Sequence, residues 1–273
     1  MKIDFHTHCF PDALAPRAMA SLHVHFSLMS SVNAHTDGTA AAAEALLKKV
    51  GVDRAVICNI ATNARQESKV NSFAIELAQS NPFTIPLGSL HPDSECQDAE
   101  LDRLSAAGIA GIKLHPDYVG VFLSDPRFDR IFSRLEERGM LCVLHTGYDP
   151  VSPNLIHATP PMILDVIKRH PKLKLVAAHM GGFAQAKGVL EYLLGEDVYL
   201  DTSLCALRPN EREMLCTILQ KHDERRLLFG TDTPWGNPTE EIAFLESAGL
   251  SAERLERIYH QNAEELLRSC ING

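Results

Sequence analysis

The feature that most limits the fold of this chain is a regular alternation of short apolar runs with longer stretches of helical periodicity. Each apolar run is bounded by Gly, Pro or charged residues, as β-strands are, and eight strand-helix pairs can be counted. The predicted strands are Ile3–His6, Ala55–Ile60, Thr84–Ser89, Gly111–His115, Leu141–His145, Lys174–His179, Val198–Asp201 and Leu227–Thr231. The predicted helices are Ala40–Lys49, Glu67–Gln79, Asp98–Ala106, Asp129–Arg138, Pro161–Arg169, Ala184–Leu194, Asn210–Gln220 and Glu240–Ser247, followed by a final pair at Ala252–Ile258 and Ala263–Arg268.

This order predicts an α/β fold, a (β/α)8 TIM barrel forming a single domain over residues 1–273. Short connections between alternating strands and helices imply parallel strands joined by right-handed crossovers, and eight such units close a barrel. A doubly wound open sheet is the structural alternative. It is less favoured because no Gly-x-Gly-x-x-Gly opens a predicted helix, and because polar residues follow many strands rather than meeting at one switch point.

The longest irregular stretch is predicted between Cys9 and Thr39, after the first strand. Structureless loops of this length are uncommon in compact domains and are usually functional. We therefore expect a lid or a substrate-binding loop here.

The charge balance argues against several classes of partner. With 26 basic and 35 acidic residues the formal net charge is −9, and no dense Lys/Arg cluster offers a nucleic-acid footprint. The chain has no apolar signal core, and no apolar run approaches the ~20 residues that cross a bilayer. We expect a cytoplasmic protein with a small-molecule substrate and no membrane partner; a homodimer is compatible with the sequence.

Reactive side chains collect at the carboxyl ends of the predicted strands, where barrel enzymes carry their active sites. The first strand ends in Asp4-Phe5-His6-Thr7-His8, and other strands lead to Lys113, His115, His145, His179, Asp201 and Asp232. Asp201 is suited to a substrate contact or to a supporting role.

His6 and His8 form the predicted core of a metal site. Side chains alternate along a strand, so the two imidazoles share one face while Phe5 and Thr7 take the other. A lone His-x-His is a weak signal: His23-Val24-His25 has the same spacing with nothing comparable around it. For His6 and His8, further imidazoles and a carboxylate are expected at the ends of other strands. Together these side chains indicate a divalent transition-metal site with an open position for water.

These strand-end motifs make the sequence similar to the amidohydrolase superfamily. Within it, the sequence resembles the amidohydrolase-2 branch, which also contains aminocarboxymuconate-semialdehyde-type decarboxylases. The resemblance spans nearly the whole chain. Its motifs are Asp4-Phe5-His6-Thr7-His8, Gly111-Ile112-Lys113-Leu114-His115-Pro116, Leu144-His145-Thr146-Gly147, Ala178-His179-Met180-Gly181-Gly182, Leu228-Phe229-Gly230-Thr231-Asp232-Thr233-Pro234-Trp235 and Asn262-Ala263.

The resemblance implies a role for most of the strand-end residues. His6, His8, His145 and Asp232 would be the metal ligands, and Asp232 would also handle the proton of the attacking water. His179 would be a catalytic base or electrophile, or a ligand of a second metal ion; the alternative is a packing residue before the Gly181-Gly182 turn.

Lys113 decides the expected number of ions. In binuclear members of the superfamily a fourth-strand lysine is carboxylated and bridges two metals, whereas decarboxylase members generally hold one. An unmodified Lys113 ammonium that binds a substrate carboxylate is equally sensible chemistry. His115 shares its face, so both are predicted substrate-binding residues. We expect one ion, or two if Lys113 is carboxylated, with zinc as first choice and manganese, iron or cobalt as alternatives.

The leading functional prediction is a hydrolase that directs a metal-activated water at an amide, ester or lactone carbonyl. The alternative is a metal-dependent, non-oxidative decarboxylase of a small carboxylic acid, which uses the same residues. A third hypothesis is a non-catalytic metal-binding barrel, which nothing in the sequence supports.

Overall fold

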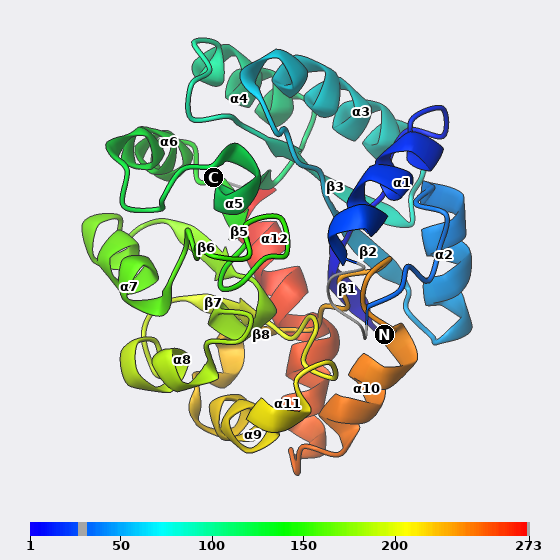
Figure 1. Cartoon of the computed structure of the whole chain (residues 1–273), viewed down its shortest axis with the longest axis vertical. Coiled ribbons are helices and arrows are strands. Elements are labelled where there is room, and N and C mark those ends of the chain that lie inside the picture. The colour runs from blue at the N-terminus through cyan, green and yellow to red at the C-terminus, as the bar shows by residue number, and fades with distance from the viewer. Residues whose placement is uncertain (27–31, 272–273) are drawn as a thin grey trace.

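A computed structural model describes residues 1–26 and 32–271 and confirms the predicted barrel. Eight parallel strands pair in sequence order, surrounded by helices (Figure 1). The strands are β1 (Ile3–Thr7), β2 (Arg54–Cys58), β3 (Thr84–Ser89), β4 (Gly111–Leu114), β5 (Leu141–Leu144), β6 (Lys174–Ala177), β7 (Tyr199–Asp201) and β8 (Leu227–Leu228).

The barrel closes between its last and first strands. The amide of Phe5 donates to the carbonyl of Phe229 at 2.7 Å, and the amide of Asp232 donates to the carbonyl of His6 at 2.7 Å. A further bond joins the His8 amide to the Thr233 carbonyl at 2.6 Å. This closure places Asp232 beside the two histidines of β1, although 224 residues separate Asp232 from His8.

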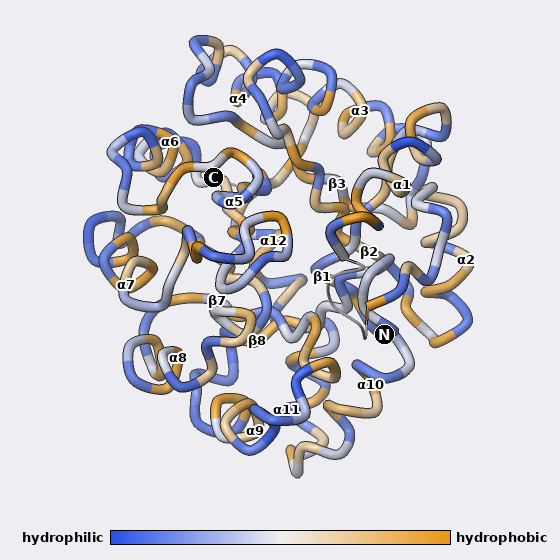
Figure 2. The backbone as a smooth tube through the Cα atoms, in the orientation of Figure 1, coloured by the Kyte–Doolittle hydropathy of each residue, from blue (hydrophilic) through white to orange (hydrophobic). Residues whose placement is uncertain are grey.

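Twelve α-helices are described: α1 (Ala15–Phe26), α2 (Ala40–Lys49), α3 (Glu67–Ser80), α4 (Gln97–Ala106), α5 (Pro116–Val119), α6 (Pro126–Glu137), α7 (Pro160–Arg169), α8 (Ala186–Tyr192), α9 (Arg212–Lys221), α10 (Pro238–Glu246), α11 (Ala252–Glu256) and α12 (Asn262–Ile271). Hydrophobic and hydrophilic residues alternate along these helices (Figure 2). In α6 the buried residues are Phe128, Ile131, Phe132 and Leu135, the spacing of one helical face. No described helix is long and apolar enough to cross a membrane.

Apolar side chains fill the barrel interior at the end that lies opposite the carboxyl ends of the strands. Alternate strand residues such as Phe5, Val143 and Val176 form one apolar cluster with Ala263 and Leu266 of α12. Figure 1 shows α12 behind the strands, so this helix covers one end of the barrel and leaves the carboxyl ends of the strands as the open end.

The alternation predicted for β1 is wrong at one point. Phe5 packs with Ile3 in the interior cluster, on the side of the barrel that also holds His6. The cause is a shift in register between Asp4 and Thr7, where three residues of β1 match two of β2. Such a bulge turns two successive side chains inward. His6 and His8 still share a face, as predicted.

The predicted irregular stretch between Cys9 and Thr39 is also wrong in part, because it contains α1. Ala15, Met19 and Leu22 follow a helical period, but Pro16 and the polar residues near His23 obscure the pattern. Pro16 is tolerated because it lies in the first turn, where its missing amide costs no helical bond. Residues 27–31 of the stretch lie outside the described residues.

Gly147, three residues after the end of β5, shows how closely the backbone segments pack at this end of the barrel. Its φ is +88°, and an added Cβ would lie 2.1 Å from the backbone nitrogen of Phe183. We expect Gly147→Ala to lower the free energy of unfolding by about 2–4 kcal/mol, measured by urea denaturation.

Gly195→Ala is the matched control for this substitution. Gly195 has a φ of +83°, but an added Cβ would meet nothing within 4 Å. It should cost only the left-handed backbone strain, about 1–2 kcal/mol. Equal losses in the two variants would show that the close approach to Phe183 does not matter.

Candidate functional site

A cavity of about 570 Å³ opens at the carboxyl ends of the strands. His8, Lys113, His115, His145, His179 and Asp232 all line it, together with residues of α1 such as Leu14 and Leu22. His6 lies beneath this surface and is fully buried. Residues of α1, within the Cys9–Thr39 stretch, therefore line the cavity, while the lid or substrate-binding role of this stretch stays a prediction.

His6, His8 and Asp232 form one group whose ligand-type atoms lie within 4.8 Å of one another. His8 Nε2 lies 3.0 Å from Asp232 Oδ1, and His6 Nε2 lies 3.6 Å from the same oxygen. These separations match neighbouring donors around a single divalent ion.

The outer ring nitrogens of both histidines are held by acceptors. His6 Nδ1 lies 2.9 Å from Asp201 Oδ2, and His8 Nδ1 lies 2.8 Å from the backbone carbonyl of Cys58. A carboxylate or carbonyl only accepts, so each Nδ1 carries the hydrogen and each Nε2 presents a lone pair. On His8 that lone pair faces a carboxylate oxygen, an arrangement that a cation between the two atoms stabilises. The donor set therefore fits a divalent metal.

Asp232 is placed by an unusual backbone. Its φ is +61°, and other non-glycine residues with positive φ, including His179 and Leu204, also follow strands at this end. Asp4 supports the turn: its Oδ1 accepts from the amides of His6 and Thr231, both at 3.0 Å, and its Oδ2 accepts from Thr231 Oγ1 at 2.6 Å. Left-handed residues of this kind are strained and cluster at functional sites.

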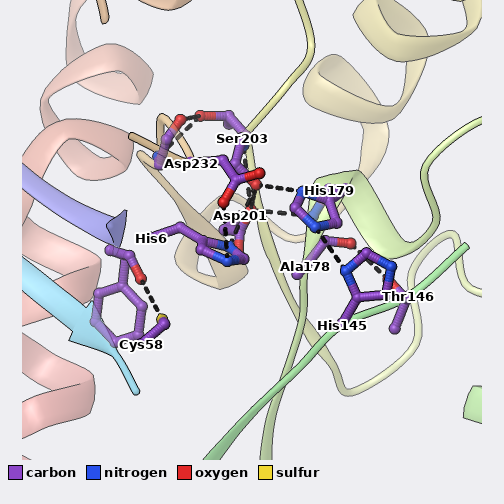
Figure 3. A network of polar contacts seen from close by, with 12 residues as sticks. His6, Cys58, His145, Thr146, Ala178, His179, Asp201, Ser203 and Asp232 are labelled. Carbon is purple, nitrogen blue, oxygen red and sulfur yellow. Dashed lines mark hydrogen bonds and ion pairs between the residues drawn. The ribbon is translucent and has the colours of Figure 1, made fainter. Parts of the chain in front are cut away.

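His179 and His145 lie next to the first group, in a connected network (Figure 3). His179 Nε2 is 3.1 Å from His145 Nδ1, and His179 Nδ1 is 2.7 Å from Ser203 Oγ. Ser203 Oγ also contacts Asp201 Oδ1, which accepts the amides of His179 and Ser203. Asp201 thus supports both His6 and His179.

Lys113 on β4 and His115 directly after it both face the cavity, as predicted from their shared face on the expected strand Gly111–His115. Lys113 is fully buried, and its Nζ lies 3.1 Å from His6 Nε2. His115 stacks on His145 with ring centroids 3.9 Å apart and on Tyr118 with centroids 3.7 Å apart. Its Nε2 lies 3.4 Å from Asp149 Oδ2.

Burial dominates the electrostatics of the site. It lowers the pKa of His6, His115, His145 and His179 well below the ordinary histidine value, and the charge of Lys113 lowers the pKa of His6 further. Neutral imidazoles keep the lone pair that a metal needs. Burial also raises the pKa of Asp232, an effect that a bound cation opposes.

The structure brings the predicted site residues together at one end of the barrel, with His6 beneath the cavity wall and the others lining it, but not into one shell. His145 does not belong to the group of His6, His8 and Asp232; its atoms group with His115 and Asp149 instead. Its predicted role as a ligand of the first ion stays a prediction. Ser203 and Asp149 were not foreseen, because neither ends a strand nor belongs to a recognisable motif.

Comparison with solved structures places the fold among known barrels. An uncharacterised TIM-barrel protein from Bordetella bronchiseptica has 18% identity and a TM-score of 0.78, with 98% of this chain and 99% of that chain covered. The 2,6-dihydroxybenzoate decarboxylase from Rhizobium has 15% identity and a TM-score of 0.69, covering 100% of this chain and 99% of that chain.

A third neighbour is 5-carboxyvanillate decarboxylase from Novosphingobium aromaticivorans, solved with manganese and 4-hydroxy-3-methoxy-5-nitrobenzoic acid. It has 16% identity and a TM-score of 0.70, covering 98% of this chain and 96% of that chain. No match was found among curated proteins. A family model described as Amidohydrolase matches residues 3–269, nearly the whole chain, and the chain therefore belongs to the amidohydrolase-2 family.

Proposed function

We propose that this protein is a metal-dependent decarboxylase that removes CO2 from a small carboxylic acid without oxidation. Membership of the amidohydrolase-2 family and decarboxylases among the structural neighbours support this reaction over the hydrolysis favoured by sequence alone. The cavity walls carry Phe10, Phe73, Tyr148 and Phe183, which suit a largely apolar or aromatic substrate.

The observation that carries the proposal is the environment of Lys113. Its side chain is fully buried at the cavity, and among residues 1–26 and 32–271 no carboxylate oxygen lies within 4.0 Å of its Nζ. A buried ammonium is costly unless an anion pairs with it. A substrate carboxylate at this position would supply that anion, directly beside His6.

His6, His8 and Asp232 would hold the divalent ion, with the predicted His145 as a further ligand. When bound, the ion supplies positive charge that orients the substrate and stabilises the electron pair left on it. Manganese joins zinc as a leading candidate because the Novosphingobium neighbour contains it, and both accept nitrogen and oxygen donors.

The reaction step requires a proton but no oxidant. The bond between the carboxylate carbon and its neighbour breaks, CO2 leaves, and the bonding electrons stay on the neighbouring carbon. Asp232 or His179 then delivers a proton to that carbon and regains one from water. Asp201 and Ser203 hold His179 in place during this transfer.

Hydrolysis is the second candidate, and the 3.0 Å pair of His8 Nε2 and Asp232 Oδ1 is the feature that favours it. In this reaction Asp232 would take a proton from a water that attacks a carbonyl carbon. The two reactions differ in their products, so one experiment separates them.

The test incubates the manganese-loaded or zinc-loaded protein with a panel of hydroxybenzoates, including 2,6-dihydroxybenzoate and 5-carboxyvanillate, and with a panel of esters and lactones. Release of CO2, with deuterium incorporated at the vacated carbon in D2O, is the expected result. Turnover of esters or lactones without CO2 release from any acid would replace the proposal by hydrolysis.

Lys113→Met should raise the KM for the carboxylate substrate about 10- to 100-fold, because a hydrogen bond between charged groups contributes about 1.5–3 kcal/mol. Met keeps much of the side-chain volume but has no charge. Steady-state kinetics at equal metal occupancy measure the change. An unchanged KM would remove Lys113 from the carboxylate-binding role.

The predicted small-molecule substrate fits this proposal. The expected cytoplasmic location and the compatibility with a homodimer remain predictions from the sequence.

A further inference from the structure

Two buried polar atoms near the ends of β4 and β5 face each other without a hydrogen bond. They are His145 Nε2 and Asp117 Oδ2, which lie 3.9 Å apart. Within residues 1–26 and 32–271 neither atom has a hydrogen-bond partner, and both side chains are buried. Buried polar atoms without partners are unfavourable, so this pair points to an interaction that forms in another state of the site.

The carboxylate of Asp117 is fixed with one oxygen directed at His145. Asp117 lies on α5, the short helix that follows β4. Its Oδ1 accepts from His157 Nδ1 at 2.8 Å and from Ser152 Oγ, both in the segment between β5 and α7. These two bonds occupy Oδ1 and hold the side chain in place. Oδ2 therefore remains as an acceptor for His145.

The two ring nitrogens of His145 face opposite sides of the site. Nδ1 lies 3.1 Å from His179 Nε2, and the His179 ring stacks on His6 with centroids 4.9 Å apart. Nδ1 is therefore the nitrogen on the side of His6, where the ion is proposed to bind, whereas Nε2 is on the side of Asp117. Figure 3 shows the order from His6 through His179 to His145.

A neutral imidazole carries one hydrogen, so the use of one ring nitrogen determines the state of the other. When Nδ1 of His145 gives its lone pair to the ion, the hydrogen lies on Nε2. Metal-binding histidines almost always donate this second N–H to a carboxylate, a carbonyl or a water. The nearby Oδ2 of Asp117 is such an acceptor.

Asp149 is the competing acceptor, because its Oδ2 lies 3.7 Å from His145 Nε2. That oxygen is also 3.4 Å from His115 Nε2, and Asp149 lines the cavity, where substrate or water can meet it. Asp117 is not among the described residues that line the cavity. Its Oδ2 therefore depends on His145, whereas Asp149 has other partners.

We propose that Asp117 is a positioning residue of the metal centre: its Oδ2 accepts from His145 Nε2 and thereby holds the Nδ1 lone pair toward the ion. A tilt of the ring that shortens the 3.9 Å separation by about 1 Å forms this bond. The carboxylate also raises the basicity of the imidazole, which strengthens its bond to a metal. The inference rests on the proposed metal centre, with His145 as a ligand, but not on the reaction that the centre performs.

The test uses zinc-loaded, full-length protein with ¹⁵N-labelled histidine rings, and NMR reports which nitrogen of His145 carries the hydrogen. Zinc has a filled d shell and therefore suits this measurement. The His145 signals are those that His145→Gln removes. In wild type we expect the hydrogen on Nε2, protected from exchange with solvent. A hydrogen on Nδ1 would contradict the proposal.

Asp117→Asn should lower the affinity for Zn²⁺ about 10- to 100-fold, as loss of a partner behind a metal ligand usually does. Asn has a single acceptor oxygen, so it cannot accept from His145 on one side and from His157 and Ser152 on the other. The Nε2 hydrogen of His145 should also lose its protection from exchange. Competition with a chelator measures the affinity, without an activity assay.

Glu136→Gln is the matched control. Glu136 also contacts a buried imidazole, His170 Nδ1 at 3.1 Å, but it lies on α6 and not among the described residues that line the cavity. The substitution should change neither the affinity for zinc nor the signals of His145. An affinity of Asp117→Asn equal to that of Glu136→Gln would overturn the proposal.

Circular dichroism verifies the folding of each variant. If Asp117→Asn does not fold, Asp149→Asn decides: a His145 hydrogen that stays protected supports Asp117 as the acceptor, and one that loses protection assigns the role to Asp149. Wild-type protein that binds no zinc would reject the proposed metal centre together with this role. Zinc binding through Nδ1, with unchanged affinity in Asp117→Asn, would reject the role of Asp117 alone.

Discussion

Asp232→Asn is expected to lower the rate of turnover by about 10²–10⁴-fold while much of the bound metal is retained, because this is the usual contribution of a positioned acid-base group. Asn keeps the shape of the side chain and one oxygen donor. It cannot carry the proton that Asp232 exchanges with the substrate or with water. The turn that holds the residue depends on Asp4 and Thr231 and is not altered by the substitution.

The measurement compares the two proteins at equal metal occupancy, with turnover followed by product formation and bound metal by mass spectrometry. Asp102→Asn, which changes an exposed carboxylate on α4, is the control and should leave the rate unchanged. The proton-transfer role is falsified if metal-matched Asp232→Asn turns over the substrate within a few-fold of wild type. His179 would then be the remaining proton donor.

The barrel was predictable because its signal is local and repeated. Each strand is a short apolar run of its own, so errors at single boundaries do not change the topology. The errors arise where local patterns are weak. Strand β8 was expected to reach Thr231 but ends at Leu228, since the chain turns toward the left-handed Asp232. Helix α1 was missed because Pro16 and the polar residues near His23 obscure its helical pattern.

Only the cavity-facing and metal-type residues of the candidate site could be predicted from the sequence. His6, His8, His145, His179 and Asp232 could be found because each lies at or just beyond the carboxyl end of an apolar strand, and barrel geometry then brings them together. The bulge in β1 could not be read from sequence, since it depends on how β1 pairs with β2.

The residues that hydrogen-bond to the histidines of the site are harder still to predict from the sequence. Asp201 Oδ2 meets His6 Nδ1 across 195 residues, and Ser203 acquires its role only because it lies between Asp201 and His179. Such contacts depend on side-chain directions in the folded barrel. The separation of His145 from the group of His6, His8 and Asp232 could not be predicted for the same reason. Strand order places all the imidazoles at one end of the barrel, but ring orientation decides which atoms face one another.

The remaining large effect concerns the first ion itself. Replacing both His6 and His8 by Ala removes two of the three metal-type donors of this group and leaves only Asp232. We expect the affinity of this site for Mn²⁺ or Zn²⁺ to fall by more than about 10²-fold, beyond the 10–100-fold that loss of a supporting group costs. His23→Ala/His25→Ala is the matched control: it has the same His-x-His spacing, but on α1 and outside every metal-type group of the described residues. Anomalous diffraction measures how much metal is bound at His6, His8 and Asp232. This occupancy should vanish in His6→Ala/His8→Ala and stay complete in His23→Ala/His25→Ala. Equal occupancy in both would mean that the two β1 imidazoles do not bind the ion.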